Sequence, residues 1–246
     1  MMFDFTNRTL VLTGANGGIG RAVAELFYRA GANLVLADID AASLEAFATT
    51  LSDPKGGAVF SLSADAANPD DADRIIERAA DMGGIDFLVP SAGIYLSEPF
   101  SEMTDEQWRR TLSINLDGVF YLTRRAVGHF KAGSSIVNLS SMAAHRGAKS
   151  NVHYGASKGA LGAMSRALAN ELAPKTRVNV VSPGVIETPM TQNLIATRGD
   201  DTLRHTPMGR MGQASEVASV IAFLCSPAAS FVNGETLHVN GGLYMS

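Results

Sequence analysis

Short runs of apolar and β-branched residues alternate along the chain with longer stretches in which apolar residues recur at helical spacing. The short runs predict strands at Thr9–Thr13, Asn33–Ala37, Ala58–Leu62, Phe87–Pro90, Ser135–Leu139, Arg177–Val181 and Thr236–Val239. The longer stretches predict helices over residues 18–30, 41–51, 69–82, 104–131, 154–172 and 214–225. Alternation of this kind indicates a doubly wound α/β fold, in which a parallel sheet carries helices on both faces.

No stretch has the composition of a linker, so we expect one domain over residues 1–246. Residues 187–212 form the longest segment without a predicted strand. We expect this segment to be a surface excursion beside a ligand site, where it would serve as a substrate loop.

Composition narrows the class of protein further. The 246 residues carry a formal net charge of -4, which argues against a partner that is nucleic acid. No apolar run is long enough to predict a membrane span, and the first residues do not resemble a signal peptide. The one cysteine, Cys225, excludes an intrachain disulfide, so we expect a cytoplasmic protein in a reducing compartment.

A glycine-rich turn follows the first predicted strand. The sequence TGANGGIG runs from Thr13 to Gly20, and a helical pattern begins directly after it. Glycines let backbone approach a pyrophosphate, and the new helix offers free N–H groups to that anion. The turn therefore predicts a dinucleotide site in a Rossmann-like domain, although a glycine-rich turn alone also fits a bare tight turn.

Asp38 ends the second predicted strand, where a carboxylate can accept both hydroxyls of an adenosine ribose and repel a 2′-phosphate. No Arg or Lys lies within the glycine turn, since Arg21 follows it. We therefore expect NAD rather than NADP. The alternative is that Asp38 or Asp40 only caps the next helix.

Tyr154 and Lys158 are four residues apart, so a helix would place both on one face. A nearby ammonium favours phenolate, and we expect it to lower the pKa of Tyr154 so that this residue exchanges a proton with a carbinol. Ser141 ends a predicted strand, where α/β sheets bind ligands. Two alternatives remain: a surface Tyr–Lys pair, and a hydrolase elbow formed by the GxSxG match around Ser157.

Together these residues closely resemble the short-chain dehydrogenase/reductase family. The matching motifs cover the whole chain in the family's order: TGANGGIG, Asp65, PSAG at 90–93, Asn115, Ser141, YGASK, PGVIETPM at 183–190 and the NGETLHVNGG ending. Pro90-Ser91 replaces the usual pair of asparagines, so we expect a local difference at that strand end.

The resemblance implies a coenzyme site made of Gly14, Asn16, Gly17, Ile19, Asp38, Asp65, Ala66, Ala92, Gly93, Tyr154, Lys158, Ile186 and Thr188. It implies a catalytic set of Asn115, Ser141, Tyr154 and Lys158. In that set Tyr154 would be the general acid/base, Lys158 would hold the nicotinamide ribose, and Ser141 would bind the substrate oxygen. Asn115 would hold a water in a proton relay, and Ile186 and Thr188 would anchor the carboxamide.

We therefore expect an NAD-dependent oxidoreductase that interconverts a secondary alcohol and a ketone. The resemblance also points to a homotetramer, and the small residues along the 154–172 helix would let a second copy pack closely. Two other functions remain open. One is a 3-oxoacyl carrier-protein reductase, against which Asp38 argues because reductive biosynthesis usually draws on NADPH. The other is a catalytically idle NAD-sensing protein.

Overall fold

The computed structural model describes residues 3–245, apart from the side chain of Arg198. Seven strands form one parallel sheet in the order β3-β2-β1-β4-β5-β6-β7. The strands are β1 (Thr9–Thr13), β2 (Asn33–Asp38), β3 (Val59–Ser63), β4 (Ile85–Pro90), β5 (Phe130–Leu139), β6 (Thr176–Pro183) and β7 (Thr236–Val239). All seven predicted strands are confirmed, and so is the doubly wound α/β fold.

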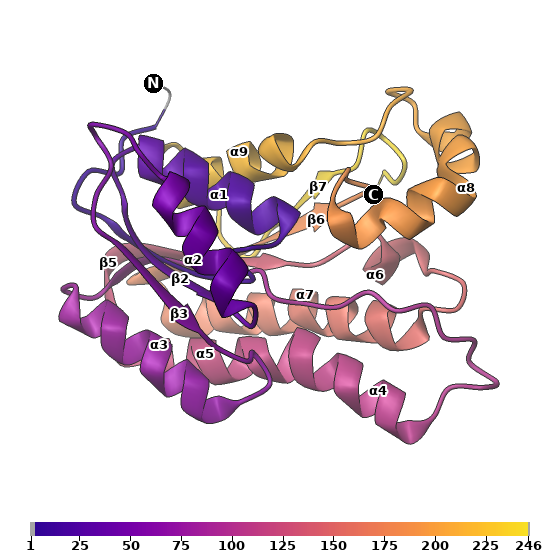
Figure 1. Ribbon diagram of the computed structural model, residues 1–246, viewed down its shortest axis with the longest axis horizontal. Helices are drawn as coiled ribbons and strands as arrows, with labels where there is room; N and C mark the ends of the chain where they lie inside the picture. The colour runs from indigo at the N-terminus through magenta and orange to yellow at the C-terminus, as the bar shows by residue number, and fades with distance from the viewer. Residues whose placement is uncertain (1–2, 246) are drawn as a thin grey trace.

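Helices cover both faces of the sheet (Figure 1). One layer holds α1 (Gly18–Arg29), α2 (Ala41–Thr50) and α9 (Ala214–Cys225). The other holds α3 (Pro69–Asp81), α4 (Asp105–Leu112), α5 (Gly118–Ala126) and α7 (Val152–Leu172). Near the C-terminus lie α6 (Ala143–Arg146) and α8 (Gln192–His205). In the described part of the chain, no helix combines the length and apolar character that crossing a membrane requires.

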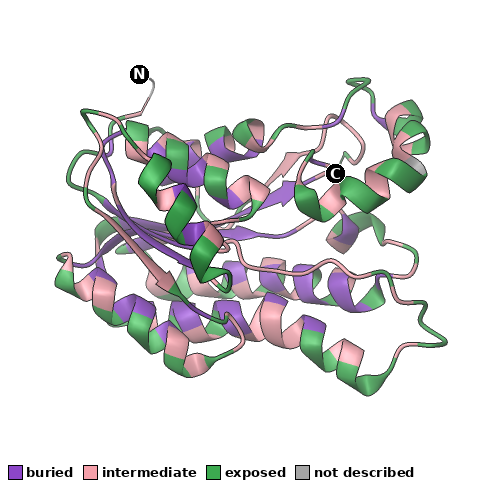
Figure 2. Cartoon of the chain, in the orientation of Figure 1, coloured by how far each residue is buried: buried purple, intermediate pink, exposed green. Residues whose placement is uncertain are grey.

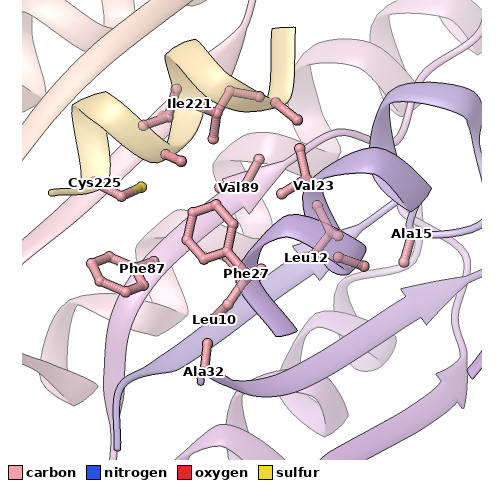
Figure 3. Close-up of a cluster of buried hydrophobic side chains, with 14 of the residues drawn as sticks. Leu10, Leu12, Ala15, Val23, Phe27, Ala32, Phe87, Val89, Ile221 and Cys225 are labelled. Atoms are coloured by element: carbon pink, nitrogen blue, oxygen red, sulfur yellow. The ribbon is translucent and has the colours of Figure 1, made fainter. Parts of the chain in front are cut away.

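The central strands are buried on both faces, as their continuous apolar runs predict. Alternate residues of β1 pack into different clusters: Leu10 and Leu12 meet Phe27 of α1, whereas Val11 meets Ile76 of α3. Figure 3 shows the first cluster between α1 and α9, and Figure 2 shows that buried residues concentrate in the strands and in the helices packed against them. This two-sided core fixes the strands, and therefore the places where their carboxyl ends project side chains.

The order of strands reverses between β1 and β4. From β1 the chain builds outward to β2 and β3, and from β4 it builds in the opposite direction to β7. Connections leave a crevice at the carboxyl ends of strands where the order reverses, and ligands bind there in open α/β sheets. The glycine turn follows β1, and PSAG begins at the end of β4.

One predicted helix is wrong in detail. The expected helix over 104–131 is interrupted, because α4 and α5 are separated by a π-helical segment, Ser113–Asp117, and β5 already begins at Phe130. Asn115 in that segment binds the backbone of Ile94, a contact between distant parts of the chain that helical periodicity does not record. Such π segments inside helices are frequent at functional sites.

The segment 187–212 contains secondary structure that the sequence analysis did not predict. A 3-10 turn, Pro189–Thr191, leads directly into α8, which has fourteen residues. The short helix α6, directly after the end of β5, was also not predicted. The role of 187–212 as a substrate loop stays a prediction.

Candidate active site

The glycine turn approaches its neighbours too closely for larger residues. A Cβ on Gly14 would lie 2.6 Å from the backbone nitrogen of Ala92, and Gly14 has a φ of +62°. A Cβ on Gly20 would lie 2.1 Å from the carbonyl oxygen of Gly14. The turn leads into α1, which begins at Gly18. No side chain caps the first N–H groups of this helix. Those uncapped N–H groups suit an anion such as a pyrophosphate.

Asp38 and Asp40 have separate roles at the end of β2. Asp40 caps α2, since its carboxylate accepts hydrogen bonds from the backbone and hydroxyl of Ser43 at 3.1 and 2.6 Å. Asp38 instead lies against the glycine turn, where its Oδ2 accepts from the backbone N–H of Asn16 at 3.0 Å. Its other oxygen accepts from the N–H of Asp40 at 3.1 Å. Each oxygen keeps a lone pair that can accept a hydroxyl.

These elements surround one cavity of about 450 Å³. Every predicted site residue lines it except Asn16 and Asn115: Gly14, Gly17, Ile19, Asp38, Asp65, Ala66, Ala92, Gly93, Ser141, Tyr154, Lys158, Ile186 and Thr188. The cavity therefore joins the glycine turn to the Tyr–Lys pair, as one extended ligand would require. The side chain of Asn16 binds the guanidinium of Arg21 instead, with Oδ1 2.6 Å from Nη2.

The Tyr–Lys pair lies on the buried face of α7, so the surface-pair alternative is excluded. Tyr154 and Lys158 are 9% and 6% exposed, and the ammonium lies 5.9 Å from the centre of the Tyr154 ring. The Lys158 ammonium donates a hydrogen bond to the carbonyl oxygen of Leu139, the last residue of β5, at 2.9 Å. Ser141, two residues further on, forms a side-chain hydrogen bond with Tyr154.

The pKa of Tyr154 is a correction to the sequence analysis. We expected Lys158 to lower it, but in the protein as described burial raises the pKa of Tyr154 to about 12, against a smaller opposing effect of the hydrogen bond from Ser141. Burial also lowers the pKa of Lys158 to about 8. Desolvation disfavours the charged form of both groups, and it is the largest cause of each shift. At neutral pH the phenol is therefore protonated and able to donate.

Asn115 is fully buried beside this pair, in the π-helical segment. Its amide binds the backbone of Ile94 reciprocally: Oδ1 accepts from the N–H at 2.8 Å, and Nδ2 donates to the carbonyl oxygen at 3.0 Å. The side chain therefore fixes the chain that follows PSAG. A Cβ on Gly93 would lie 3.1 Å from Asn115 Oδ1 and 3.6 Å from Lys158 Nζ, which shows how closely these elements meet.

The replacement Pro90-Ser91 leaves the strand end regular. Pro90 is paired with Thr13 as the last residue of β4. The N–H of Ser91 then donates to the carbonyl oxygen of Thr13 at 3.1 Å. The local difference expected here is therefore confined to the proline's missing donor.

The structure also excludes the hydrolase alternative at Ser157. Ser157 is fully buried in the middle of α7 and donates to the carbonyl oxygen of Tyr154 at 2.8 Å, so it cannot act as an exposed nucleophile on a turn. His145 is exposed and stacks on Tyr244 at 5.3 Å between ring centres. His153 is buried against Glu98.

Sequence reasoning missed part of the cavity wall. The residues concerned include Ile39, Ile75, Arg110 and Ile114. Ile39, 70% exposed, could have been found because it is an apolar residue between two aspartates at a strand end. The Tyr95 ring also meets that of Tyr154 edge to face, with centres 4.8 Å apart. No sequence signal gives that contact.

Comparison with known proteins places this geometry in a family. A family model described as enoyl-(acyl carrier protein) reductase matches residues 14–244. The chain is 38% identical to nodulation protein G of Rhizobium meliloti (strain 1021), over 99% of this chain and 100% of the relative. It is 37% identical to 3-oxoacyl-(acyl-carrier-protein) reductase FabG of Salmonella typhimurium, over 98% of this chain and 99% of the relative.

Solved structures agree with the sequence relatives. One is a short-chain dehydrogenase/reductase from Brucella melitensis, described as a glucose/ribitol dehydrogenase, which is 63% identical to this chain. The two structures superpose with a TM-score of 0.97 over 100% of both chains. These relatives favour an enzyme over a catalytically idle NAD-sensing protein. The chain therefore belongs to the short-chain dehydrogenase/reductase family and is an oxidoreductase that acts on CH–OH groups.

Proposed function

We propose that the protein interconverts a secondary alcohol and a ketone with NAD(H), using Tyr154 as the general acid/base. One observation carries this proposal: Ser141, Tyr154 and Lys158 meet at the same cavity as the glycine turn. A hydroxyl and a phenol can bind a carbonyl oxygen, and the phenol, next to an ammonium, can transfer a proton to it. The cavity's length along the carboxyl ends of the strands suits a dinucleotide that reaches this set.

The residues present fit NAD. The glycine turn leaves room for backbone to contact the pyrophosphate, and Asp38 faces the cavity with lone pairs for ribose hydroxyls. Its negative charge would repel the 2′-phosphate of NADP. Asp65 and Ala66 would contact adenine, and Ile186 and Thr188 would hold the carboxamide. When bound, the nicotinamide ring supplies or accepts the hydride.

In the reducing direction the neutral phenol of Tyr154 donates its proton to the carbonyl oxygen. Burial keeps that phenol protonated at neutral pH, since it raises the pKa of Tyr154. Ser141 binds the same oxygen and orients the phenol. In the oxidising direction the phenolate form of Tyr154 accepts the hydroxyl proton of the alcohol, and Lys158 stabilises that phenolate by its charge.

Lys158 and Asn115 complete the proposed catalytic set. The Lys158 ammonium, fixed by Leu139, would donate its remaining hydrogens to the nicotinamide ribose. Asn115 would hold a water in a relay that returns a proton to Tyr154. Its side chain is already bound to Ile94, so its own backbone is the part of the residue left to hold that water.

The relatives support a second candidate, reduction of a 3-oxoacyl thioester on a carrier protein. FabG of Salmonella typhimurium carries that name, and the matching family model is described by a carrier-protein reductase. The same catalytic set would serve both substrates. The two candidates differ in substrate and in the expected coenzyme, so one assay separates them.

We propose that the protein is a cytoplasmic homotetramer. On α7 the buried face holds Tyr154 and Lys158, while Ala156, Ala163 and Ala167 lie on the exposed side. Phe120 of α5 is also 49% exposed. Small and apolar surfaces of this kind let helices of a second copy pack closely. Light scattering should give four times the 25.9 kDa chain mass, and a monomeric mass would refute the assembly.

The test of the function is a panel of secondary alcohols, ketones and 3-oxoacyl thioesters, followed by NADH and NADPH absorbance. We expect turnover of an alcohol–ketone pair with NAD(H). Turnover confined to the thioester with NADPH would favour the second candidate. NADH binding without turnover of any panel member would contradict both.

A further inference from the structure

Residues 94–98, which we call the wall segment, are fastened to the start of α7 by polar contacts. The N–H of Glu98 donates to the carbonyl oxygen of Ser150 at 2.7 Å. The Asn151 amide donates to the carbonyl oxygen of Leu96. Asn151 precedes the first residue of α7, yet its side chain does not cap its own helix. The buried amide is committed to the wall segment instead.

The wall segment also contacts the proposed acid/base directly. The hydroxyl of Tyr95 donates to Asn151 Oδ1 at 3.2 Å. The Tyr95 ring lies edge to face against the Tyr154 ring, with an interplanar angle of 81°. The orientation of the Tyr154 ring therefore depends on where Tyr95 is held.

Glu98 and His153 form the one ion-pair contact between the wall segment and α7 in the described residues. His153 Nε2 lies 2.7 Å from Glu98 Oε2, although the contact does not have hydrogen-bond geometry. The His153 side chain is fully buried and that of Glu98 is 16% exposed. In the described part of the chain both atoms are buried, and neither forms a hydrogen bond with any other group. His153 directly precedes Tyr154 in the chain.

We propose that Glu98 and His153 are positioning residues for the reaction, which fix the wall segment so that Tyr95 holds the Tyr154 ring in its reactive orientation. The inference rests on the proposed role of Tyr154. Neither residue lines the cavity, so both act through Tyr95 and Tyr154.

The energetics favour positioning over bulk stability as the role of this pair. A buried ion pair loses hydration, so an apolar pair of similar size often stabilises a fold as well. What an apolar pair lacks is the polar contact that sets the 2.7 Å spacing between Glu98 and His153. Small misplacements of a catalytic group reduce rate steeply, since the reacting atoms must lie near their transition-state geometry. The pair would therefore affect turnover more than folding or coenzyme binding.

The experiment compares Glu98→Leu, His153→Leu and the double variant with wild type. Each single variant should lower kcat by about tenfold to a hundredfold, because the Tyr154 ring loses its fixed orientation. The NADH Kd should stay within about twofold, since neither substituted residue lies in the proposed coenzyme site. The double variant should lose no more than the more impaired single variant, because the two side chains act as a unit. Glu98→Gln keeps an oxygen acceptor for His153 and should restore most of kcat.

Matched controls are Glu102→Gln, an exposed acid on the same stretch of chain, and His129→Asn, an exposed histidine before β5. Both should behave like wild type. The proposal is overturned if the leucine variants match these controls in kcat, or if their NADH Kd rises in step with the fall in kcat. If the leucine variants do not fold, Glu98→Gln and His153→Asn are compared in the same way, and an unchanged kcat in His153→Asn overturns it.

A separate readout keeps this inference distinct from the proposed function. Amide hydrogen exchange at Glu98 should accelerate in Glu98→Leu and His153→Leu but not in Glu102→Gln. If wild type turns over no alcohol or ketone, the proposed function fails and the exchange measurement decides whether the pair fixes the segment. Unchanged exchange in both leucine variants would overturn the coupling itself.

Discussion

At the coenzyme end of the cavity, between β1 and α1, the walls are backbone and glycine; at the catalytic end, between β5 and α7, they are buried polar side chains. Gly14 and Gly20 shape the first end by leaving no room for a Cβ. Tyr154 and Lys158 shape the second end. Burial raises the pKa of Tyr154 and lowers that of Lys158, so it favours the uncharged form of each. Substitutions at the first end should therefore affect binding, and those at the second should affect the reaction.

Tyr154→Phe should have the largest effect, because it removes the proposed proton donor. Turnover should fall by about a thousandfold, the scale of general acid–base catalysis. The NADH Kd, measured by fluorescence, should change little because the phenyl ring still fills its place against Tyr95. If the variant keeps wild-type turnover, the proposed role of Tyr154 at the catalytic end is wrong.

Gly20→Ala tests the coenzyme end. Its Cβ would lie 2.1 Å from the carbonyl oxygen of Gly14, so the turn must shift. NADH affinity should fall at least about tenfold, and the free energy of unfolding should fall by about 1–3 kcal/mol.

Gly159→Ala is the matched control, because its Cβ meets nothing within 4 Å and lies inside α7. It should raise the free energy of unfolding by about 0.5–1 kcal/mol. Equal NADH binding by both variants would refute the steric account.

Asp38→Ala should shift the coenzyme preference. Loss of a charged acceptor should weaken NADH binding by about tenfold, and loss of the negative charge should strengthen NADPH binding. Asp40→Ala provides the control, since it removes only the cap of α2 and should cost about 1 kcal/mol of folding free energy. The test is the ratio of the NADH Kd to the NADPH Kd, measured for each variant and for wild type. A ratio that moves equally in both variants would assign Asp38 no role in selection.

The pH dependence should differ between the two directions. Oxidation needs the phenolate, and raising the pKa of Tyr154 to about 12 lowers its phenolate fraction at neutral pH. The oxidation rate should therefore rise about tenfold per pH unit below the pKa of Tyr154 in the complex. Reduction needs the phenol and should stay flat from about pH 6 to 8. Initial rates in both directions test this, and a flat oxidation profile would remove Tyr154 as the base.

The sequence reveals the geometry of the coenzyme end for a physical reason. A close backbone approach admits only glycine, so the residue type at Gly14 reveals the geometry. Continuous apolar runs likewise reveal strands that are buried on both faces. The break in the 104–131 helix is different, since it follows from the contact between Asn115 and Ile94, which are 21 residues apart. Helical periodicity carries no record of such a contact.

The remaining errors have similar causes. α8 was not predicted because its residues are mixed in character and include Gly199, and no side chain caps its start. The pKa of Tyr154 was expected to fall because spacing reveals Lys158 but not burial. Burial of the phenol decides that balance, and only the folded chain shows it.

The most direct measurement is a crystal structure of the complex with NAD and an unreactive analogue of the ketone found by the panel. The account predicts the analogue's carbonyl oxygen within about 3.2 Å of the Tyr154 hydroxyl and its carbonyl carbon within about 3.5 Å of the nicotinamide carbon that exchanges hydride. An analogue whose oxygen contacts another donor, with Tyr154 turned away, would contradict it.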